Sequence, residues 1–230
     1  MHRSSLRSNS TLSISTQLLT GALLLTFSSI GQTACSDPAA PNVDWFECDF
    51  SGRNLQGKDL RGANLAMTNL EDSNLSHANL SGATLTGSRL NRSKLLGITL
   101  DNADLRWAEF ERADISSASL QQANLSEAKL QRTQLAGSDL SGSNLVQADL
   151  RSANLKSTRL ENANLSAADL SDANLFGANL NRTNLGNSNL QRANLAQTRI
   201  QQSNLAWANL SGANLASSNI SDSNLAHVTT

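Results

Sequence analysis

The chain has 230 residues, a net charge of −1 at pH 7, an apolar content of 39% and an aromatic content of only 3%. This length suits one ordinary domain or two, but a conventional two-layer core would contain more, and more varied, large apolar residues. The near-zero charge, with both signs interspersed, argues against a nucleic-acid-binding or membrane-surface-binding protein. Leu, Ala, Asn and Ser dominate, which indicates an internal repeat.

Residues 1–35 are predicted to be an export signal. Arg3 and Arg7 give a basic start without any acid, and an apolar run of thirteen residues follows from Leu18 to Ile30. A run of this length is too short to span a bilayer as a helix and suits the core of a signal peptide. Small residues follow and place the cleavage near 34–36. We therefore expect an exported protein whose mature chain has no transmembrane span.

Two cysteines, Cys35 and Cys48, lie on either side of a linker and N-terminal cap at 36–47. Cys35 follows Ala34 as in bacterial lipoproteins, but Gln32 stands where those proteins usually have an apolar residue, which argues against a lipid anchor. A disulfide between the two cysteines is feasible in an oxidising compartment. The sequence slightly favours a third interpretation, in which Cys48 is only a small buried residue of the first repeat.

A five-residue period covers residues 48–227. From Phe50 to Leu225 every fifth residue is Leu, Ile or Phe, which makes 36 consecutive units, 31 of them centred on Leu. The residue two before the centre is Ala, Ser or Thr in 32 units, and the residue just before the centre is Asn or Asp in 26. Ten glycines stand two residues after a centre, where a tight corner would favour them.

This period fits neither a helix nor a flat strand. Five residues advance about 500° around an α-helix, which would scatter the Leu side chains around the axis. On a strand, an odd spacing sends them to alternate faces. They converge only if the chain turns a corner in every unit, so the sequence predicts a solenoid with a narrow Leu-filled interior. Asn can form ladders between stacked coils, whereas stacked Asp residues repel each other.

Charge pairs indicate how many units make one coil. At a separation of four units, opposite charges face each other in five cases, among them Arg89 with Glu109 and Lys129 with Asp149. At the same separation, one pair of like charges, Asp149 with Asp169, counts against a coil of four units. At a separation of three units there are three opposite pairs. Because adjacent opposite charges are favourable, the counts favour four units per coil over three.

These units resemble the A(D/N)LXX repeats of pentapeptide-repeat proteins, as at Ala63-Asn64-Leu65 and Ala173-Asn174-Leu175. The resemblance implies an all-β fold, a right-handed quadrilateral β-helix that would have about nine coils here. An export signal before an unbroken repeat is similar to members of the periplasm and the thylakoid lumen, most of which have no known activity. Other members mimic DNA and inhibit gyrase, but they use a strongly acidic surface, a dimerising C-terminal element and a cytoplasmic location. We expect none of these features here.

The sequence contains no catalytic constellation. The three histidines, His2, His77 and His227, are far apart, and neither Cys nor His has the spacing of a metal site. The many serines occupy repeat positions without an accompanying base. We therefore predict a protein that is not an enzyme and that uses no cofactor or metal.

The surface offers one group of candidate binding residues. If the coils have four sides, Arg92, Arg112 and Arg132 stack at one corner, and Trp107 and Trp207 share the neighbouring corner across one face. Arg and Trp are enriched in binding hot spots, which makes these five residues the candidates for binding a protein partner, while the sequence favours a solvated, ion-paired face as the other interpretation. The unbroken repeat predicts a scaffold or binding module. Self-association through the open coil ends is the alternative, and DNA mimicry is the least favoured one.

Overall fold

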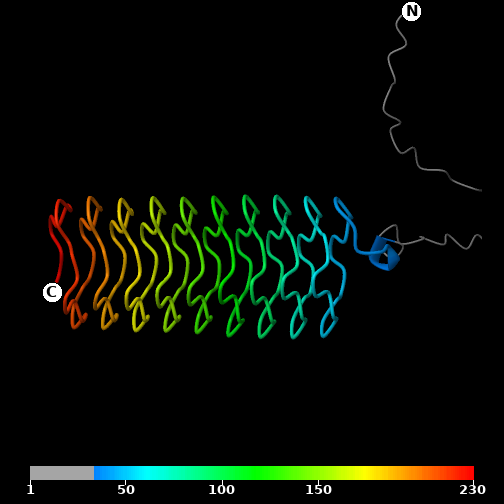
Figure 1. Ribbon diagram of the computed structural model, residues 1–230, viewed down its shortest axis with the longest axis horizontal. Helices are drawn as coiled ribbons and strands as arrows, with labels where there is room; N and C mark the ends of the chain where they lie inside the picture. The colour runs from blue at the N-terminus through cyan, green and yellow to red at the C-terminus, as the bar shows by residue number, and fades with distance from the viewer. Residues whose placement is uncertain (1–33) are drawn as a thin grey trace, which may run out of the picture.

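The computed structural model describes residues 34–230 (Figure 1). The predicted export signal lies almost wholly outside these residues and stays a prediction. A turn of 3-10 helix, η1 (Ala34–Ser36), comes first. The chain then winds into coils that stack into a rod along the long axis of Figure 1. In the described part of the chain, η1 is the only helix, and isolated parallel bridges join the coils in place of long strands.

The bridge register fixes the size of one coil. Every parallel bridge joins residues that are 20 positions apart, from Asp44 with Asn64 to Asn209 with Thr229. This separation equals four five-residue units. The four-unit coil that the charge pairs favoured is therefore confirmed.

The coils extend beyond the predicted bounds of 48–227. Asp44 already forms a bridge at one end and Thr229 at the other, so the five-residue geometry covers residues 41–230. Trp45 occupies the centre of the first unit and is only 2% exposed. A pattern of Leu, Ile and Phe misses this unit because its central residue is Trp, and it misses the last unit because the central residue there is Thr.

A β-turn forms each corner. In most units the N–H of the third residue after the centre donates to the central carbonyl, as Ser73 does to Leu70 at 3.2 Å. Every fifth residue from 42 to 227 has a positive φ, which the third position of a type II turn requires. All ten glycines predicted at the corners adopt it, and 28 other corners hold non-glycine residues. Each of these costs roughly 1 kcal/mol of strain, which the rest of the fold has to offset.

The backbone hydrogen bonds explain the Asn and Asp preference. In the unit 73–77, one N–H closes the turn and three donate to carbonyls of neighbouring coils at 2.8–2.9 Å. The remaining N–H, of Ser76, donates to Oδ1 of Asn74 at 3.1 Å. Asn and Asp are suited to this local bond, and an unpaired buried N–H would cost about 1–3 kcal/mol. Where Asn or Asp stands before the centre, its side chain thus completes the backbone hydrogen bonding of the unit.

The predicted Asn ladder forms along the column that contains residues 124 to 224. Nδ2 of Asn184 donates to Oδ1 of Asn164 at 3.1 Å, and Nδ2 of Asn204 donates to Oδ1 of Asn184 at 2.9 Å. Asn224 continues the series on Asn204 at 3.1 Å. These amides bond along the rod axis while each Oδ1 also serves its own unit, so this column is structural.

In three units without Asn or Asp before the centre, the adjacent coil supplies the acceptor. The N–H of Glu111 donates to Oδ1 of Asn91 at 2.8 Å, and the N–H of Gln201 donates to Oδ1 of Asn181 at 2.9 Å. The N–H of Gln121 bonds in the same way to Asp101. In these three units the backbone donor therefore keeps a side-chain acceptor although the repeat pattern is broken.

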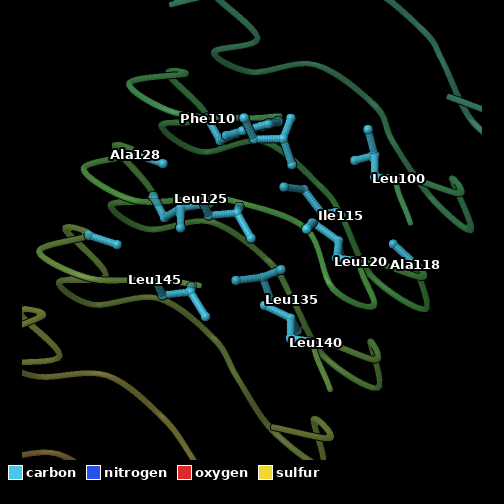
Figure 2. Close-up of a cluster of buried hydrophobic side chains, with 14 of the residues drawn as sticks. Leu100, Phe110, Ile115, Ala118, Leu120, Leu125, Ala128, Leu135, Leu140 and Leu145 are labelled. Atoms are coloured by element: carbon cyan, nitrogen blue, oxygen red, sulfur yellow. The ribbon is translucent and has the colours of Figure 1, made fainter. Parts of the chain in front are cut away.

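The central side chains converge on the interior, as the period predicts. Figure 2 shows Leu100, Phe110, Ile115 and their neighbours pointing inward from successive coils, and all three are at most 1% exposed. Interior Ser and Thr hydroxyls donate to backbone carbonyls, as Ser73 does to Leu70 at 2.6 Å. Among the side chains that the structure describes, no buried nitrogen or oxygen lacks a hydrogen-bond partner.

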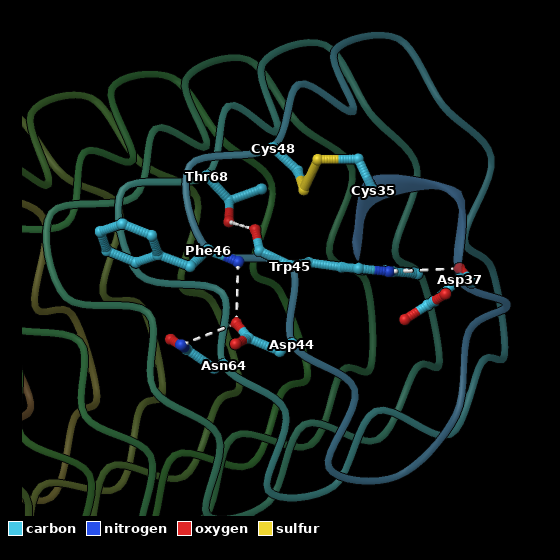
Figure 3. The surroundings of a disulfide bond; sticks show 8 residues. All are labelled: Cys35, Asp37, Asp44, Trp45, Phe46, Cys48, Asn64 and Thr68. Atoms are coloured by element: carbon cyan, nitrogen blue, oxygen red, sulfur yellow. Dashed lines mark hydrogen bonds between the residues drawn. A yellow bond between two sulfur atoms is a disulfide. The ribbon is translucent and has the colours of Figure 1, made fainter. Parts of the chain in front are cut away.

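A disulfide-bonded segment covers part of the N-terminal coil end (Figure 3). Cys35 and Cys48 are bonded, with their Cα atoms 5.5 Å apart. The interpretation that Cys48 is only a small buried residue is therefore wrong, because the chain before the first coil folds back over the coil end. The Trp45 indole N–H donates to the carbonyl of Asp37 at 3.3 Å, and its ring lies 4.2 Å from that of Phe50.

We expect Asn184→Ala to lower the free energy of unfolding by about 1–3 kcal/mol, because the N–H of Gly186 would lose its acceptor. The matched control is Arg199→Ala, since Arg199 has the same place in its unit but Asn181 accepts the bond there. Guanidinium unfolding of both variants measures the difference. Equal losses would show that the side-chain acceptor is not needed.

Candidate functional site

All five predicted binding residues lie at corners. Arg92, Arg112, Arg132, Trp107 and Trp207 have φ between 57° and 64°. The bridge register places the three arginines on consecutive coils of one corner, and it places the two tryptophans on the neighbouring corner, five coils apart. The predicted columns are therefore present, and whether they bind a partner stays a prediction.

Arg92 is engaged within the protein. Its Nε and Nη2 donate to both carboxylate oxygens of Asp72, at 2.9 and 2.8 Å, and Nη2 also lies 3.3 Å from Glu71. The hydrogen bond from Arg92 lowers the pKa of Asp72, and the same bond raises the pKa of Arg92. About half of the Arg92 side chain is exposed, so solvent weakens the pair, but its bidentate geometry keeps Nε and Nη2 engaged with Asp72.

The other two arginines are held more loosely. Nε of Arg112 lies 3.6 Å from Glu111, which is too long for a hydrogen bond. Arg132 makes no ion pair with any residue of the described chain, 34–230. These two guanidinium groups can therefore reach an external carboxylate or carbonyl.

The two tryptophans differ in their surroundings. Trp107 is 48% exposed, and the guanidinium of Arg106 lies 5.4 Å from its ring centroid. Arg106 is itself paired with Asp104 at 2.7 Å. Trp207 is 61% exposed, but it stacks on the ring of His227 at 4.0 Å. One ring face of Trp207 is thus covered.

The predicted charge ladder on the face between these corners is only partly formed. Lys129 pairs with Glu109 at 2.8 Å, as expected. Arg89 turns instead to Glu71 at 2.5 Å, and Asp149 pairs with Arg151 two residues later at 2.6 Å.

Arg151 also lies 3.9 Å from Asp169. Arg151 therefore lies near both Asp149 and Asp169, the pair of like charges that counted against a coil of four units. Pairs two residues apart in one unit, such as Asp149 with Arg151, are a signal that the comparison of columns missed.

The structure brings no further chemistry to this face. Within residues 34–230 there is no group of three His, Cys, Asp or Glu side chains that could hold a metal ion. No helix in that range is long and apolar enough to cross a membrane. A polar hollow of about 340 Å³ lies elsewhere on the rod, and the sequence did not indicate it. Its lining consists of Glu161, Asn162, Asn181, Arg182, Gln201 and Gln202.

A five-residue unit with a central Leu, a corner in every unit and a four-unit bridge register define a four-sided β-solenoid. The family model for pentapeptide repeats matches residues 46–82, 68–106, 108–145, 128–166, 168–205 and 188–226. The chain belongs to the pentapeptide-repeat family, whose fold is a right-handed quadrilateral β-helix.

Several solved structures are similar to this chain. HetL, a pentapeptide-repeat protein involved in heterocyst differentiation regulation in the cyanobacterium Nostoc sp. PCC 7120, is 28% identical over 84% of this chain and 92% of its own, with a TM-score of 0.41. A pentapeptide-repeat protein of the Arabidopsis thaliana thylakoid lumen is 28% identical over 54% of this chain and 68% of its own, with a TM-score of 0.32. The plasmid-mediated fluoroquinolone resistance protein QnrB1 is 17% identical over 74% and 92%, with a TM-score of 0.42. No curated protein matches this sequence.

Proposed function

We propose that this protein is an exported, non-enzymatic rod of about nine coils that serves as a scaffold or binding module for another protein. The observation that carries the proposal is the pair of loosely held cations, Arg112 and Arg132, on consecutive coils of one corner. Trp107 stands on the neighbouring corner of the same coil as Arg112. Exposed Arg and Trp side chains are the residues that most often dominate protein interfaces.

Most side chains have a structural task in the coil, which supports a role without catalysis. In most units the backbone, the central side chain, the small interior side chain and the Asn or Asp side chain are engaged in the coil. The side chains that remain for another task are those at the corners and beside them. A binding function needs only such an exposed surface, whereas catalysis would need a group of convergent reactive side chains.

The disulfide supports export. Disulfides persist in oxidising compartments such as the periplasm and the extracellular space. The Cys35–Cys48 bond also occupies the Sγ atom that a lipid thioether at Cys35 would need.

We expect intact-mass analysis of the protein recovered from its native compartment to show that the chain begins at Ala34 or Cys35. Its mass should be two hydrogens below that of the form with two free thiols, and it should carry no lipid. A lipid on Cys35, or a chain that keeps residues 1–33, would contradict this part of the proposal.

We expect Arg112→Glu with Arg132→Glu to abolish retention of the native partner on immobilised protein. The partner's groups that pair with the two arginines would then face two carboxylates, which repel them. The matched control, Arg182→Glu with Arg199→Glu, makes the same change in net charge on other parts of the surface. Equal retention by both double variants would exclude the corner of Arg112 and Arg132 as the binding surface.

Self-association through the coil ends is the second candidate. In the last described coil, Leu225 is 43% exposed, and the backbone N–H groups of Leu215 and Ile220 have no backbone acceptor among residues 34–230. We expect sedimentation velocity to show a species that grows with concentration if this end pairs, because unpaired strand edges add further chains. A monomer at every concentration would exclude it.

A further inference from the structure

A second exposed cluster lies at the corner of Trp107, toward the N-terminal end of the rod. Phe46, Met67 and Trp107 are 46%, 54% and 48% exposed, and they are three of the six large apolar residues exposed in the described chain. Met67 and Trp107 share one corner column, and Phe46 lies beside that column in the first coil. At about 4.8 Å per coil, the cluster, which we call the apolar ridge, is about 15 Å long.

Gly87 separates Met67 from Trp107 in the corner column and shapes the ridge. A Cβ atom at Gly87 would lie only 2.7 Å from Sδ of Met67. The thioether therefore lies over Gly87, on the side of Trp107. The glycine lets the two apolar side chains approach along the rod axis.

The fold does not require these side chains. Met67 and Trp107 both have a φ of 57°, a conformation that strains large side chains. Glycine occupies ten equivalent corners without that strain. Figure 3 shows the Phe46 ring pointing away from the Trp45 indole and from the disulfide, so it takes no part in the N-terminal cap. Strained, solvent-exposed apolar residues at one corner point to a role outside folding.

The ridge is bordered by carboxylates. Glu47 precedes Met67 by one coil in the same corner column, and Glu127 follows Trp107 by one coil. Asp44 and Asp49 flank Glu47 in the first coil. Within residues 34–230, these four acids form no ion pair, whereas the three nearby cations are paired with other acids: Arg106 with Asp104, Arg89 with Glu71 and Lys129 with Glu109. The surroundings of the ridge are therefore electrostatically negative.

We propose that the apolar ridge with its acidic border docks a basic amphipathic helix of a partner protein. Glu47 and Glu127 are four coils apart, about 19 Å, which a helix covers in about 13 residues. Lys or Arg near both ends of such a helix would meet the carboxylates, and its apolar face would pack on Met67 and Trp107. Exposed Met and aromatic side chains are used in this way by proteins that bind basic helices. The inference rests on the proposed binding function but places it on a different corner from Arg112 and Arg132.

The test uses two synthetic peptides, each long enough to form this helix and with the same apolar helical face, titrated calorimetrically into the full chain. One peptide has Lys and the other has Glu at the polar positions. We expect one Lys peptide to bind per chain and the Glu peptide not to bind. Met67→Gly with Trp107→Gly should weaken binding about tenfold or more, and glycine suits both corners, so this variant should fold. Gln147→Gly with Asn187→Gly is the matched control on the same corner column, where both residues have a positive φ, and it should leave the affinity unchanged.

A second variant, Glu47→Gln with Glu127→Gln, tests the acidic border. It should weaken binding of the Lys peptide at low salt and have a smaller effect at high salt. Failure of the Lys peptide to bind, or equal affinity for the double-glycine variant and the unaltered chain, would overturn the proposal. Arg112→Glu with Arg132→Glu should not weaken peptide binding. If that variant loses the native partner while the double-glycine variant keeps it, the ridge proposal fails and the proposed function stands.

Discussion

The whole structure depends on a backbone hydrogen-bond network that repeats with every coil and is complete only with a side-chain acceptor. In a unit with Asn or Asp before the central Leu, four N–H groups bond to backbone carbonyls and the fifth donates to Oδ1 of that side chain, as the N–H of Ser76 does to Asn74. This bond holds the chain in the corner that brings the next Leu back to the common axis. The corner imposes a positive φ on every fifth residue, and burial of the Leu column offsets the resulting strain. The narrow interior, the small residues beside each Leu and the Asn ladders are consequences of this arrangement.

The corners are where the fold leaves the identity of a side chain most open. Residues there face solvent and can be glycine, serine, arginine or tryptophan without changing the register. Two of the four corner columns carry the distinctive side chains, Arg112 and Arg132 on one and Met67 and Trp107 on the next. A rod of this kind can thus present side chains at intervals of about 4.8 Å along an axis. For this reason both proposals place function on corners, while the flat face with the Asn184 ladder is structural.

The period could be interpreted from the sequence because it is a property of the backbone path. Five-residue spacing excludes a helix and a flat strand, and charge pairs at a separation of four units favoured the four-unit coil that the bridges confirm. The columns of Arg92 and Trp107 followed from the same arithmetic. Residue spacing places a side chain in a column but does not give its rotamer. The spacing therefore did not show that Arg92 is held by Asp72 or that Trp207 stacks on His227. It also could not give the Cys35–Cys48 disulfide, because that bond depends on a segment outside the repeat folding back over the coil end.

The most direct test of the four-unit register is a pair of engineered disulfides between small, outward-facing positions. Ser126→Cys with Val146→Cys joins neighbouring coils at the predicted separation of four units, whereas Ser126→Cys with Ser141→Cys joins positions only three units apart. Adjacent parallel strands bring such side chains within the reach of a disulfide. Mild oxidation followed by peptide mapping, with the native Cys35–Cys48 bond intact, should yield the first crosslink in high proportion and not the second. Efficient formation of the three-unit crosslink, or of neither, would contradict a coil of four units.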